Sequence, residues 1–351
     1  MGKTVVVGMS GGVDSTFAAA YLKNEGYEVI GVMLRLWAET GMEEQNKCCS
    51  PDAMTMARRV AAMLDVPFYV IDAKEAFRAK VVEYFIQGYT RGITPNPCLV
   101  CNTDIRWRTL LEQADKFGAD MVATGHYAQI DHSNPAPKLL RGRDTRKDQS
   151  YVLSRLPLEY LKRTILPVAG FTKPEVMAYC QDLHLPTAAR PDSQDLCFLG
   201  EMNYRDFLAK YSPSSLQPGD IVDSNGKVLG KHQGLGAYTL GQRKGLRIAY
   251  KEPLYVIDKD AENNRLMVGT KDETKKQTIH VSLFNWLEKP EVEGFDALVQ
   301  VRYNSRPQPA KIFAKLNEAE IEFEQPVADI ASGQVAAIYV GNVCWGGGII
   351  V

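Results

Sequence analysis

An apolar run that breaks into paired glycines near the N-terminus constrains this chain more than any other feature. Residues 5–7 are three consecutive valines, a pattern typical of a strand buried on both faces of a parallel sheet. Gly11 and Gly12 then permit a sharp turn and a close backbone approach to a ligand. Residues 14–24 predict a helix that ends at Gly26. The amides and the positive end of that helix would face an anion.

The loop between this strand and helix differs from the Walker phosphate loop. No Gly-Lys-Ser/Thr follows at the required spacing, so no lysine is placed to reach a γ-phosphate. Residues 10–15 instead resemble the loop of ATP pyrophosphatases, which release pyrophosphate and transfer AMP. In that interpretation the serines and glycines hold the leaving pyrophosphate, and Asp14 helps to place Mg²⁺, which prefers carboxylate and phosphate oxygens. The alternative is an ordinary glycine turn between a strand and a helix.

Length and composition restrict the class of protein. A chain of 351 residues exceeds one typical core and predicts two or three domains. With 45% apolar and 24% charged residues, the composition is that of a soluble globular protein. There is no basic-then-apolar leader and no run of about 18 apolar residues, so we expect a cytoplasmic protein without membrane segments. Seven cysteines in such a chain indicate reduced thiols with metal or catalytic roles.

The first half of the sequence alternates between strand and helix patterns, which predicts an α/β fold with a doubly wound parallel sheet. Beyond about residue 200, glycine-rich turns separate short β-prone runs. We therefore expect a catalytic domain at residues 1–200, a small central domain at 201–272 and an all-β barrel at 273–351. The predicted strands are residues 27–37, 67–72 and 120–127, and the predicted helices are residues 50–64, 74–92 and 172–184.

Two cysteine sites accompany the predicted nucleotide loop. A loop stiffened by prolines delivers Cys98 and Cys101 just before a helix expected from about Thr103. A thiol near a helix start has its thiolate favoured, so Cys101 should be a good nucleophile or metal ligand. Cys197 lies in a second, polar segment, and residues 124–127 follow a predicted strand where ligand-binding residues are expected. Together these features suggest sulfur chemistry next to a nucleotide.

These motifs occur in the order seen in bacterial tRNA-specific 2-thiouridylases, and the resemblance covers nearly the whole chain. The family resemblance implies a tRNA-uridine 2-sulfurtransferase that binds tRNA for Lys, Glu and Gln. Such an enzyme uses ATP to adenylate C2 of the wobble uridine, releases pyrophosphate, and then replaces the oxygen with sulfur as AMP leaves. The matching segments are residues 10–15, 96–102, 123–128, 147–151, 192–198, 239–246 and 301–303.

The resemblance also implies roles for individual residues of the enzyme, which we expect to be a monomer. Cys101 matches the nucleophile, and Cys197 matches a persulfide carrier supplied by a sulfur-relay protein or cysteine desulfurase. Asp14 belongs to the catalytic set. ATP-contact positions are Gly8, Met9, Ser10, Gly11, Gly12, Val13, Asp14, Ser15, Leu34 and Gly125. Target-base positions are Asn96, Pro97 and Cys98, and tRNA-contact positions are His126, Lys147, Asp148, Gln149, Arg302, Tyr303 and Gln334.

Physical reasoning supports an RNA substrate in two respects. A stacked base cannot be adenylated at C2, so it must be flipped out, which single-stranded loops make inexpensive. Residues 225–251 also contain no Asp or Glu, which makes them a candidate phosphate-facing patch, or alternatively a solvated surface. The cations of this basic segment are Lys227, Lys231, Arg243, Lys244, Arg247 and Lys251.

One departure from the family pattern leaves the sulfur route open. Many relatives have aspartate where this chain has Cys98. Three thiolates, from Cys98, Cys101 and Cys197, could hold a [4Fe-4S] cluster with one iron open to sulfide. The alternatives are a persulfide on Cys197 and, less favoured, structural zinc.

Two other functional classes also share part of the pattern. Another ATP pyrophosphatase, such as a synthetase or amidotransferase acting on a small molecule, would explain the first loop but not the paired cysteine sites. A noncatalytic RNA-binding sulfur carrier would not need an intact Asp14 and Ser15.

Overall fold

The computed structural model describes residues 3–39, 41, 50–187 and 196–351. Cys48, Cys49 and the predicted motif residues 192–195 lie outside the described residues. The chain divides into two compact units that interleave in sequence. The first unit contains Met1–Val81, Cys98–Glu201 and Asn342–Trp345, and the second contains Val82–Pro97, Met202–Gly341 and Gly346–Val351.

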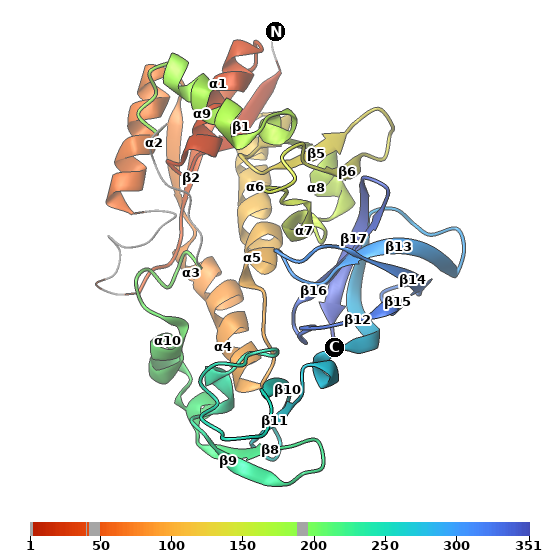
Figure 1. Cartoon of the computed structure of the whole chain (residues 1–351). Coiled ribbons are helices and arrows are strands. Elements are labelled where there is room, and N and C mark those ends of the chain that lie inside the picture. The colour runs from red at the N-terminus through yellow and green to blue at the C-terminus, as the bar shows by residue number, and fades with distance from the viewer. Residues whose placement is uncertain (1–2, 40, 42–49, 188–195) are drawn as a thin grey trace. The chain divides into compact units, whose positions relative to one another are not determined.

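A five-stranded parallel sheet forms the centre of the first unit and confirms the predicted α/β fold (Figure 1). Its order is β3-β2-β1-β4-β7, so the order reverses between β1 and β4. Ligands of doubly wound sheets bind beyond the strand ends at this switch point. Val5, Val6 and Val7 have no exposed surface because both sheet faces are covered. The strands are β1 (Thr4–Gly8), β2 (Glu28–Arg35), β3 (Phe68–Asp72), β4 (Met121–Ala123) and β7 (Thr164–Ile165).

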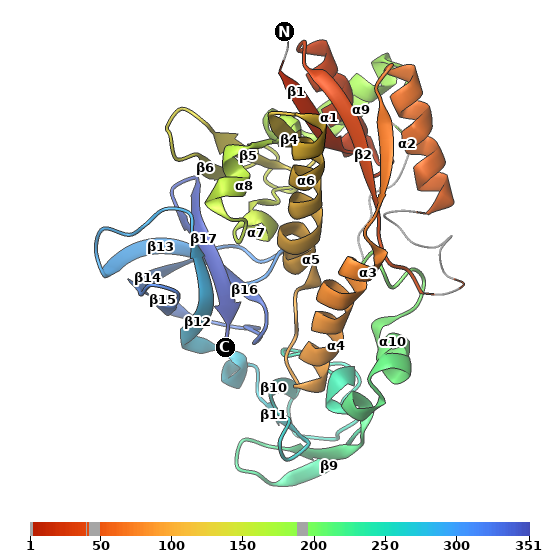
Figure 2. The same ribbon diagram turned by 180° about the vertical axis from the view of Figure 1, so that it is seen from behind.

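Helices cover both faces of this sheet. Figures 1 and 2 show α1 and α9 on one face and α6 on the other. Phe17 of α1 packs with Val168 and Val176 in a buried cluster. The predicted helix start at Ser50 is confirmed, because its hydroxyl accepts a hydrogen bond from Ala53 N (3.2 Å). The bounds are α1 (Val13–Asn24), α2 (Pro51–Met63), α3 (Lys74–Phe77), α6 (Arg108–Phe117), α7 (Ser150–Leu153), α8 (Leu158–Lys162), η4 (Pro167–Gly170) and α9 (Lys173–Asp182).

The helix that carries the paired cysteines begins earlier than the sequence predicted. Helix α5 (Pro97–Val100) runs directly into the π-helical turn η3 (Cys101–Trp107) and then into α6. Pro97 suits a first helical position because that position needs no amide donor. The expected start at Thr103 is therefore wrong, and both cysteines lie within the helix. The predicted helix at residues 74–92 is likewise interrupted by a π-helical turn, η2 (Arg78–Val82), before α4 (Glu83–Thr90).

A β-hairpin completes the first unit. Its strands are β5 (Ala128–Asp131) and β6 (Lys138–Arg141), and β6 pairs with the first residues of β17 (Val343–Ile350). In the part of the chain that the structure describes, no helix is long and apolar enough to cross a membrane.

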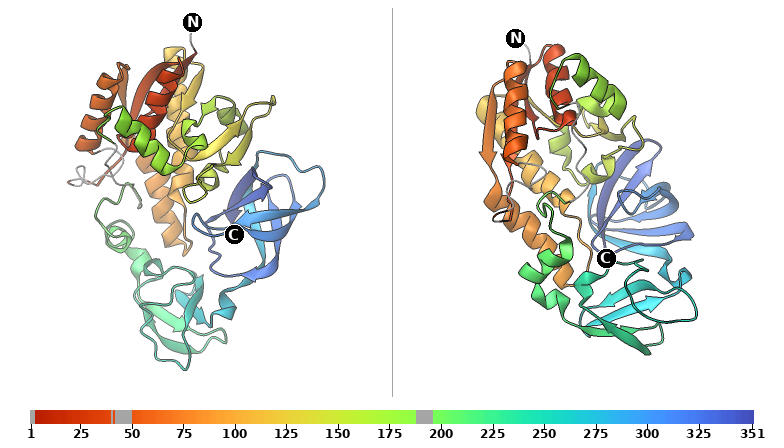
Figure 3. Two further views of the ribbon diagram at one scale, coloured as in Figure 1. Left: turned by 45° about the horizontal axis from the view of Figure 1, so that its top comes forward. Right: turned by 60° about the vertical axis from the view of Figure 1, so that its left-hand side comes forward.

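The second unit contains a small central β domain and a C-terminal barrel, both as predicted (Figure 3). The central sheet has the order β10-β11-β8-β9, and Ile221, Val256 and Leu266 form part of its core. The barrel has the order β12-β15-β14-β13-β16-β17 and closes through pairing of β12 with β17.

The elements of the second unit have the following bounds. Beside α4, the helices are α10 (Tyr204–Tyr211), η5 (Pro213–Leu216), η6 (Leu235–Ala237) and η7 (Asp272–Thr274). The central strands are β8 (Gly219–Val222), β9 (Val228–His232), β10 (Tyr255–Asp260) and β11 (Arg265–Gly269). The barrel strands are β12 (Lys276–Trp286), β13 (Gly294–Gln300), β14 (Gln308–Ala314), β15 (Ala319–Val327), β16 (Val335–Val340) and β17.

Candidate active site

The glycine loop (residues 10–15), which connects β1 with the first turn of α1, has the form of an anion-binding loop. Ser15 Oγ accepts a hydrogen bond from Ser10 N (3.1 Å) and donates one to Gly12 O (3.0 Å), which fixes the turn. Gly11 has φ +75°, and a Cβ there would lie 2.3 Å from Ala53 O, so only glycine fits. The N-cap residue Gly12 has no side chain to cap α1, which leaves the first turn suited to an anion.

Asp14 projects from the first turn of α1 and is bound by two side chains. Lys173 Nζ lies 2.8 and 2.9 Å from its two carboxylate oxygens. The Tyr127 hydroxyl donates to Oδ1 at 2.7 Å. The Asp14 side chain is 28% exposed and that of Lys173 only 13%, so solvent screens this ion pair weakly. Asp14 and Lys173 therefore place one negative and one positive group beside the loop, where phosphates and Mg²⁺ are expected.

The segment after β4 touches the glycine loop. A Cβ at Gly125 would lie 2.5 Å from Asp14 C and 2.7 Å from Ser15 N, so the two backbones are in contact. The predicted strand at residues 120–127 ends at Ala123, because the chain leaves the sheet to follow the loop. Leu34, the other predicted ATP-contact residue, is half-buried near the end of β2. Both residues thus lie near the carboxyl ends of sheet strands.

His126 is buried, with both ring nitrogens in hydrogen bonds. Nδ1 lies 2.8 Å from Thr124 Oγ1, and Nε2 lies 3.2 Å from Arg106 Nη1. Burial and the neighbouring Arg106 guanidinium hold the pKa of His126 well below its usual value, so the imidazole is neutral. An RNA contact at this predicted position would therefore use the backbone.

The sulfur residues differ in exposure. Cys98 is exposed, Cys101 is 7% exposed and Cys197 is half-buried. The segment after Cys197 is anchored by Phe198, whose ring packs edge-on against Phe77 at 6.0 Å. The predicted target-base residues also differ in exposure: Asn96 is half-buried, Pro97 is buried and Cys98 is exposed. The thiols of Cys98 and Cys197 are therefore more accessible to solvent than that of Cys101.

The predicted tRNA-contact loop at residues 147–149 is ordered by its own side chains. Asp148 accepts hydrogen bonds from Gly142 N and Ser150 N, each 3.0 Å long. Gln149 Oε1 accepts from Tyr127 N (3.0 Å), which connects this loop to the residue that binds Asp14. Lys147 is half-buried. Asp148 and Gln149 therefore fix the conformation of the loop, and Lys147 carries its positive charge.

The remaining predicted tRNA contacts belong to the second unit. Arg302 Nη2 donates to Leu240 O (3.1 Å), Tyr303 is 40% exposed, and Gln334 Nε2 donates to Thr94 O (2.8 Å). All six cations of the basic segment are exposed, although Lys231 pairs with Asp220 and Lys251 with Glu252. The central domain therefore exposes the side chains of these cations to solvent.

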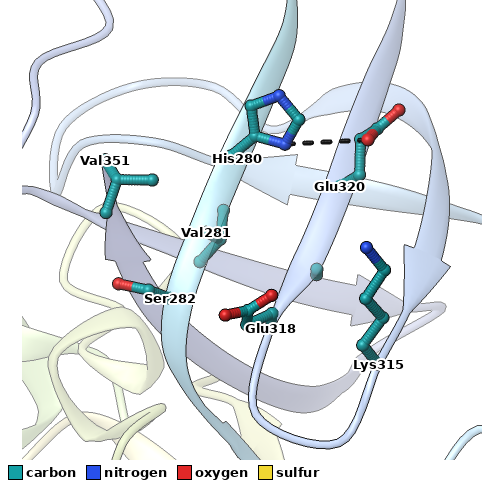
Figure 4. Close-up of a pocket in the computed structure, with 8 residues that line it drawn as sticks. His280, Val281, Ser282, Lys315, Glu318, Glu320 and Val351 are labelled. Atoms are coloured by element: carbon teal, nitrogen blue, oxygen red, sulfur yellow. Dashed lines mark ion pairs between the residues drawn. The ribbon is translucent and has the colours of Figure 1, made fainter.

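Metal-ligating side chains do not gather in the described part of the chain. No group of three or more His, Cys, Asp or Glu side chains there could hold a metal ion, although Cys98, Cys101 and Cys197 are all described. Figure 4 shows a pocket in the C-terminal barrel, where His280 Nδ1 lies 3.6 Å from Glu320 Oε2. Its lining residues belong to none of the predicted sites.

Comparison with known proteins agrees with this arrangement. Three family models match successive segments: the tRNA methyl transferase HUP domain at residues 3–201, the tRNA methyl transferase PRC-barrel domain at 205–270, and the aminomethyltransferase beta-barrel domain at 276–350. The tRNA-specific 2-thiouridylase MnmA of Carboxydothermus hydrogenoformans is 42% identical over 99% of this chain and 97% of its own length. The MnmA of Chloroflexus aggregans is 43% identical over 99% of this chain and 98% of its own length. The chain belongs to the tRNA-specific 2-thiouridylase family.

Two residues of the candidate site, Lys173 and Arg106, were not predicted from the sequence. Lys173 binds Asp14, and Arg106 binds His126. Tyr127, which also binds Asp14, lies in the segment 124–127 where ligand-binding residues were expected. Lys173 opens α9 within the predicted capping box, where its local sequence indicates only a helix start. Nothing local connects it to Asp14, 159 residues away.

We expect Gly125→Ala to weaken ATP binding by about 10-fold or more, because the added methyl group must push the strand end away from the loop. Isothermal titration with ATP measures this effect. Gly170→Ala is the control, since a Cβ at Gly170 has no atom within 4 Å. Wild-type affinity in the Gly125 variant would contradict the close contact.

The lowered pKa of His126 predicts that the free energy of unfolding depends on pH. Its native pKa lies below the unfolded value of about 6.5, so only the unfolded chain gains this proton as the pH falls. The associated stability is fully present above about pH 6.5 and falls by up to about 2 kcal/mol at pH 5. Urea unfolding at pH 7 and pH 5 should show a smaller acid loss for His126→Gln than for wild type. His184→Gln changes an exposed histidine and should show the same decrease in stability between pH 7 and pH 5 as wild type. If His126→Gln also shows the full wild-type decrease, the buried imidazole is not neutral.

Proposed function

We propose that this chain is an ATP-dependent tRNA-uridine 2-sulfurtransferase that makes 2-thiouridine at the wobble position of tRNA for Lys, Glu and Gln. The single observation that carries the proposal is a convergence in the first unit. Gly125 contacts the backbone of the glycine loop, and the next residue, His126, is hydrogen bonded to the helix of Cys101. Family membership and the pyrophosphatase fold, which implies ATP use, support the same reaction.

In the first step, the O2 oxygen of uridine attacks the α-phosphate of ATP and pyrophosphate leaves. The loop amides, Ser10 and Ser15 would hold the pyrophosphate at the positive end of α1. Asp14 suits Mg²⁺, which usually binds one or two carboxylates together with substrate phosphates. Bound Mg²⁺ would neutralise charge on the leaving pyrophosphate. Lys173 would then be available to the phosphates.

In the second step, sulfur forms a bond to C2 and AMP leaves. We propose the persulfide route, in which the terminal sulfur on Cys197 is transferred and the Cys101 thiolate attacks Cys197 Sγ. The resulting Cys101–Cys197 disulfide requires an external thiol reductant. The half-buried position of Cys197 suits loading by a sulfur-relay protein or cysteine desulfurase. Among the described residues, Cys98, Cys101 and Cys197 form no group that could hold a metal ion, which supports the persulfide route over a three-thiolate cluster.

Recognition of tRNA would use both units. In the first unit we assign it to Asn96, Pro97 and Cys98 near the base, the His126 backbone, and the loop of Lys147, Asp148 and Gln149. In the second unit we assign it to Arg302, Tyr303 and Gln334. The exposed cations of the basic segment would add phosphate contacts that weaken as salt rises.

The sulfur route is tested by measuring iron and 2-thiouridine formation on the same anaerobically purified protein. With ATP, Mg²⁺, tRNA and a persulfide donor, we expect iron-free protein to be active. Cys197→Ser and Cys101→Ser should each lose at least about 100-fold in rate, as expected for loss of a covalent nucleophile. Cys98→Asp should stay active, because the persulfide route does not use this thiol. Activity that follows iron content, is supported by sulfide alone and is lost in Cys98→Asp would instead establish the cluster route.

A further inference from the structure

The turn that carries Cys101 has an unusual geometry. Residues Cys101–Trp107 form a π-helical turn between two α-helical segments. Such turns are rare and occur frequently at functional sites, because the wider turn moves side chains out of α-helical register. Arg106 follows Cys101 by five residues, the hydrogen-bond spacing of a π-helix. The cysteine and the guanidinium therefore belong to the same π-helical turn.

Arg106 connects this turn to the end of β4. Its Nη1 lies 3.2 Å from Asn102 Oδ1 and 3.2 Å from His126 Nε2. A guanidinium only donates hydrogen bonds, so both partners accept. His126 must then carry its proton on Nδ1 and donate it to Thr124 Oγ1. The tautomer of the neutral imidazole is thus set by its two neighbours.

Asn102 fixes the other side of the same turn. It directly follows Cys101, is only 3% exposed, and donates from Nδ2 to Val152 O of α7 at 3.2 Å. Its two hydrogen bonds hold the backbone next to Cys101 between α7 and Arg106. A buried amide that lost one of these bonds would bear the cost of an unsatisfied group.

The end of β4 also reaches the nucleotide loop. Gly125 contacts the backbone of Asp14 and Ser15. In the chain it lies between Thr124 and His126, whose side chains are hydrogen bonded to each other. A short segment therefore contacts the loop on one side and holds Arg106 on the other. The position of the Cys101 turn is coupled to that of the loop through two hydrogen bonds and one backbone contact.

We propose that Arg106 is a positioning residue for the sulfur-transfer step, which holds the Cys101 turn in register with the nucleotide loop through Asn102 and His126. This inference rests on the proposed function. Because the hydrogen bonds of Arg106 hold the turn and His126, whereas Gly125 contacts the loop, loss of Arg106 should affect sulfur transfer more than adenylation.

The test compares Arg106→Met, Arg106→Lys and the control Arg108→Met, which removes the same charge from an exposed position on the following turn. Each variant is assayed for tRNA-dependent ATP–pyrophosphate exchange, for single-turnover 2-thiouridine formation with a persulfide donor, and for thermal unfolding. Arg106→Met should keep exchange within about 3-fold of wild type and lose thiolation by about 30-fold or more, in line with a small misplacement of a reacting group. Arg106→Lys, which keeps donors on a long side chain, should recover at least a third of the thiolation rate.

Equal losses of exchange and thiolation in Arg106→Met, or wild-type thiolation in it, would overturn the assignment. If Arg106→Met does not fold, His126→Phe removes the acceptor of the Arg106 hydrogen bond. This variant should likewise lose thiolation while keeping ATP–pyrophosphate exchange. His126→Gln, which keeps a side-chain acceptor for Arg106, should lose less thiolation than His126→Phe. Absence of tRNA-dependent exchange in the wild-type protein would instead refute the proposed function.

Discussion

The contact between Gly125 and the backbone of Asp14 and Ser15 is the constraint on which the site depends. It follows from the sheet order, because β1 and β4 are neighbours and both point their carboxyl ends to the same edge. The glycine loop follows β1, and the histidine segment follows β4. A side chain at Gly125 would separate them. The nucleotide loop and the helix of Cys101 are therefore brought together by the fold itself.

Charge pairing is the second constraint. Asp14 is half-buried near the positive end of α1, and Lys173 and Tyr127 satisfy its oxygens. A shielded carboxylate without partners would raise the free energy of the folded protein. The same lysine brings a positive charge to the place where phosphates are expected. The ion pair thus stabilises the loop, and in the proposed reaction Lys173 supplies a cation for ATP.

The sequence predicted the parts of the site better than their connections. The valine strand, the glycine turn and the Ser50 helix start depend on local chemistry, and the structure confirms them. The π-helical turn was missed, because its hydrogen-bond shift depends on tertiary contacts such as that of Arg106 with His126. Lys173 was missed because its partner lies far away in the chain. The burial of His126 likewise depends on Trp107, whose ring lies 5.2 Å from it.

The most direct test of the central claim asks whether one site first adenylates tRNA and then transfers sulfur. Cys101→Ser protein is incubated with tRNA, Mg²⁺ and ATP labelled on the α-phosphate, without a sulfur donor. We predict tRNA-dependent release of pyrophosphate and label bound to tRNA, which later addition of persulfide-loaded wild-type protein converts to AMP and 2-thiouridine. Release of pyrophosphate without tRNA, or of ADP instead of pyrophosphate, would contradict the account.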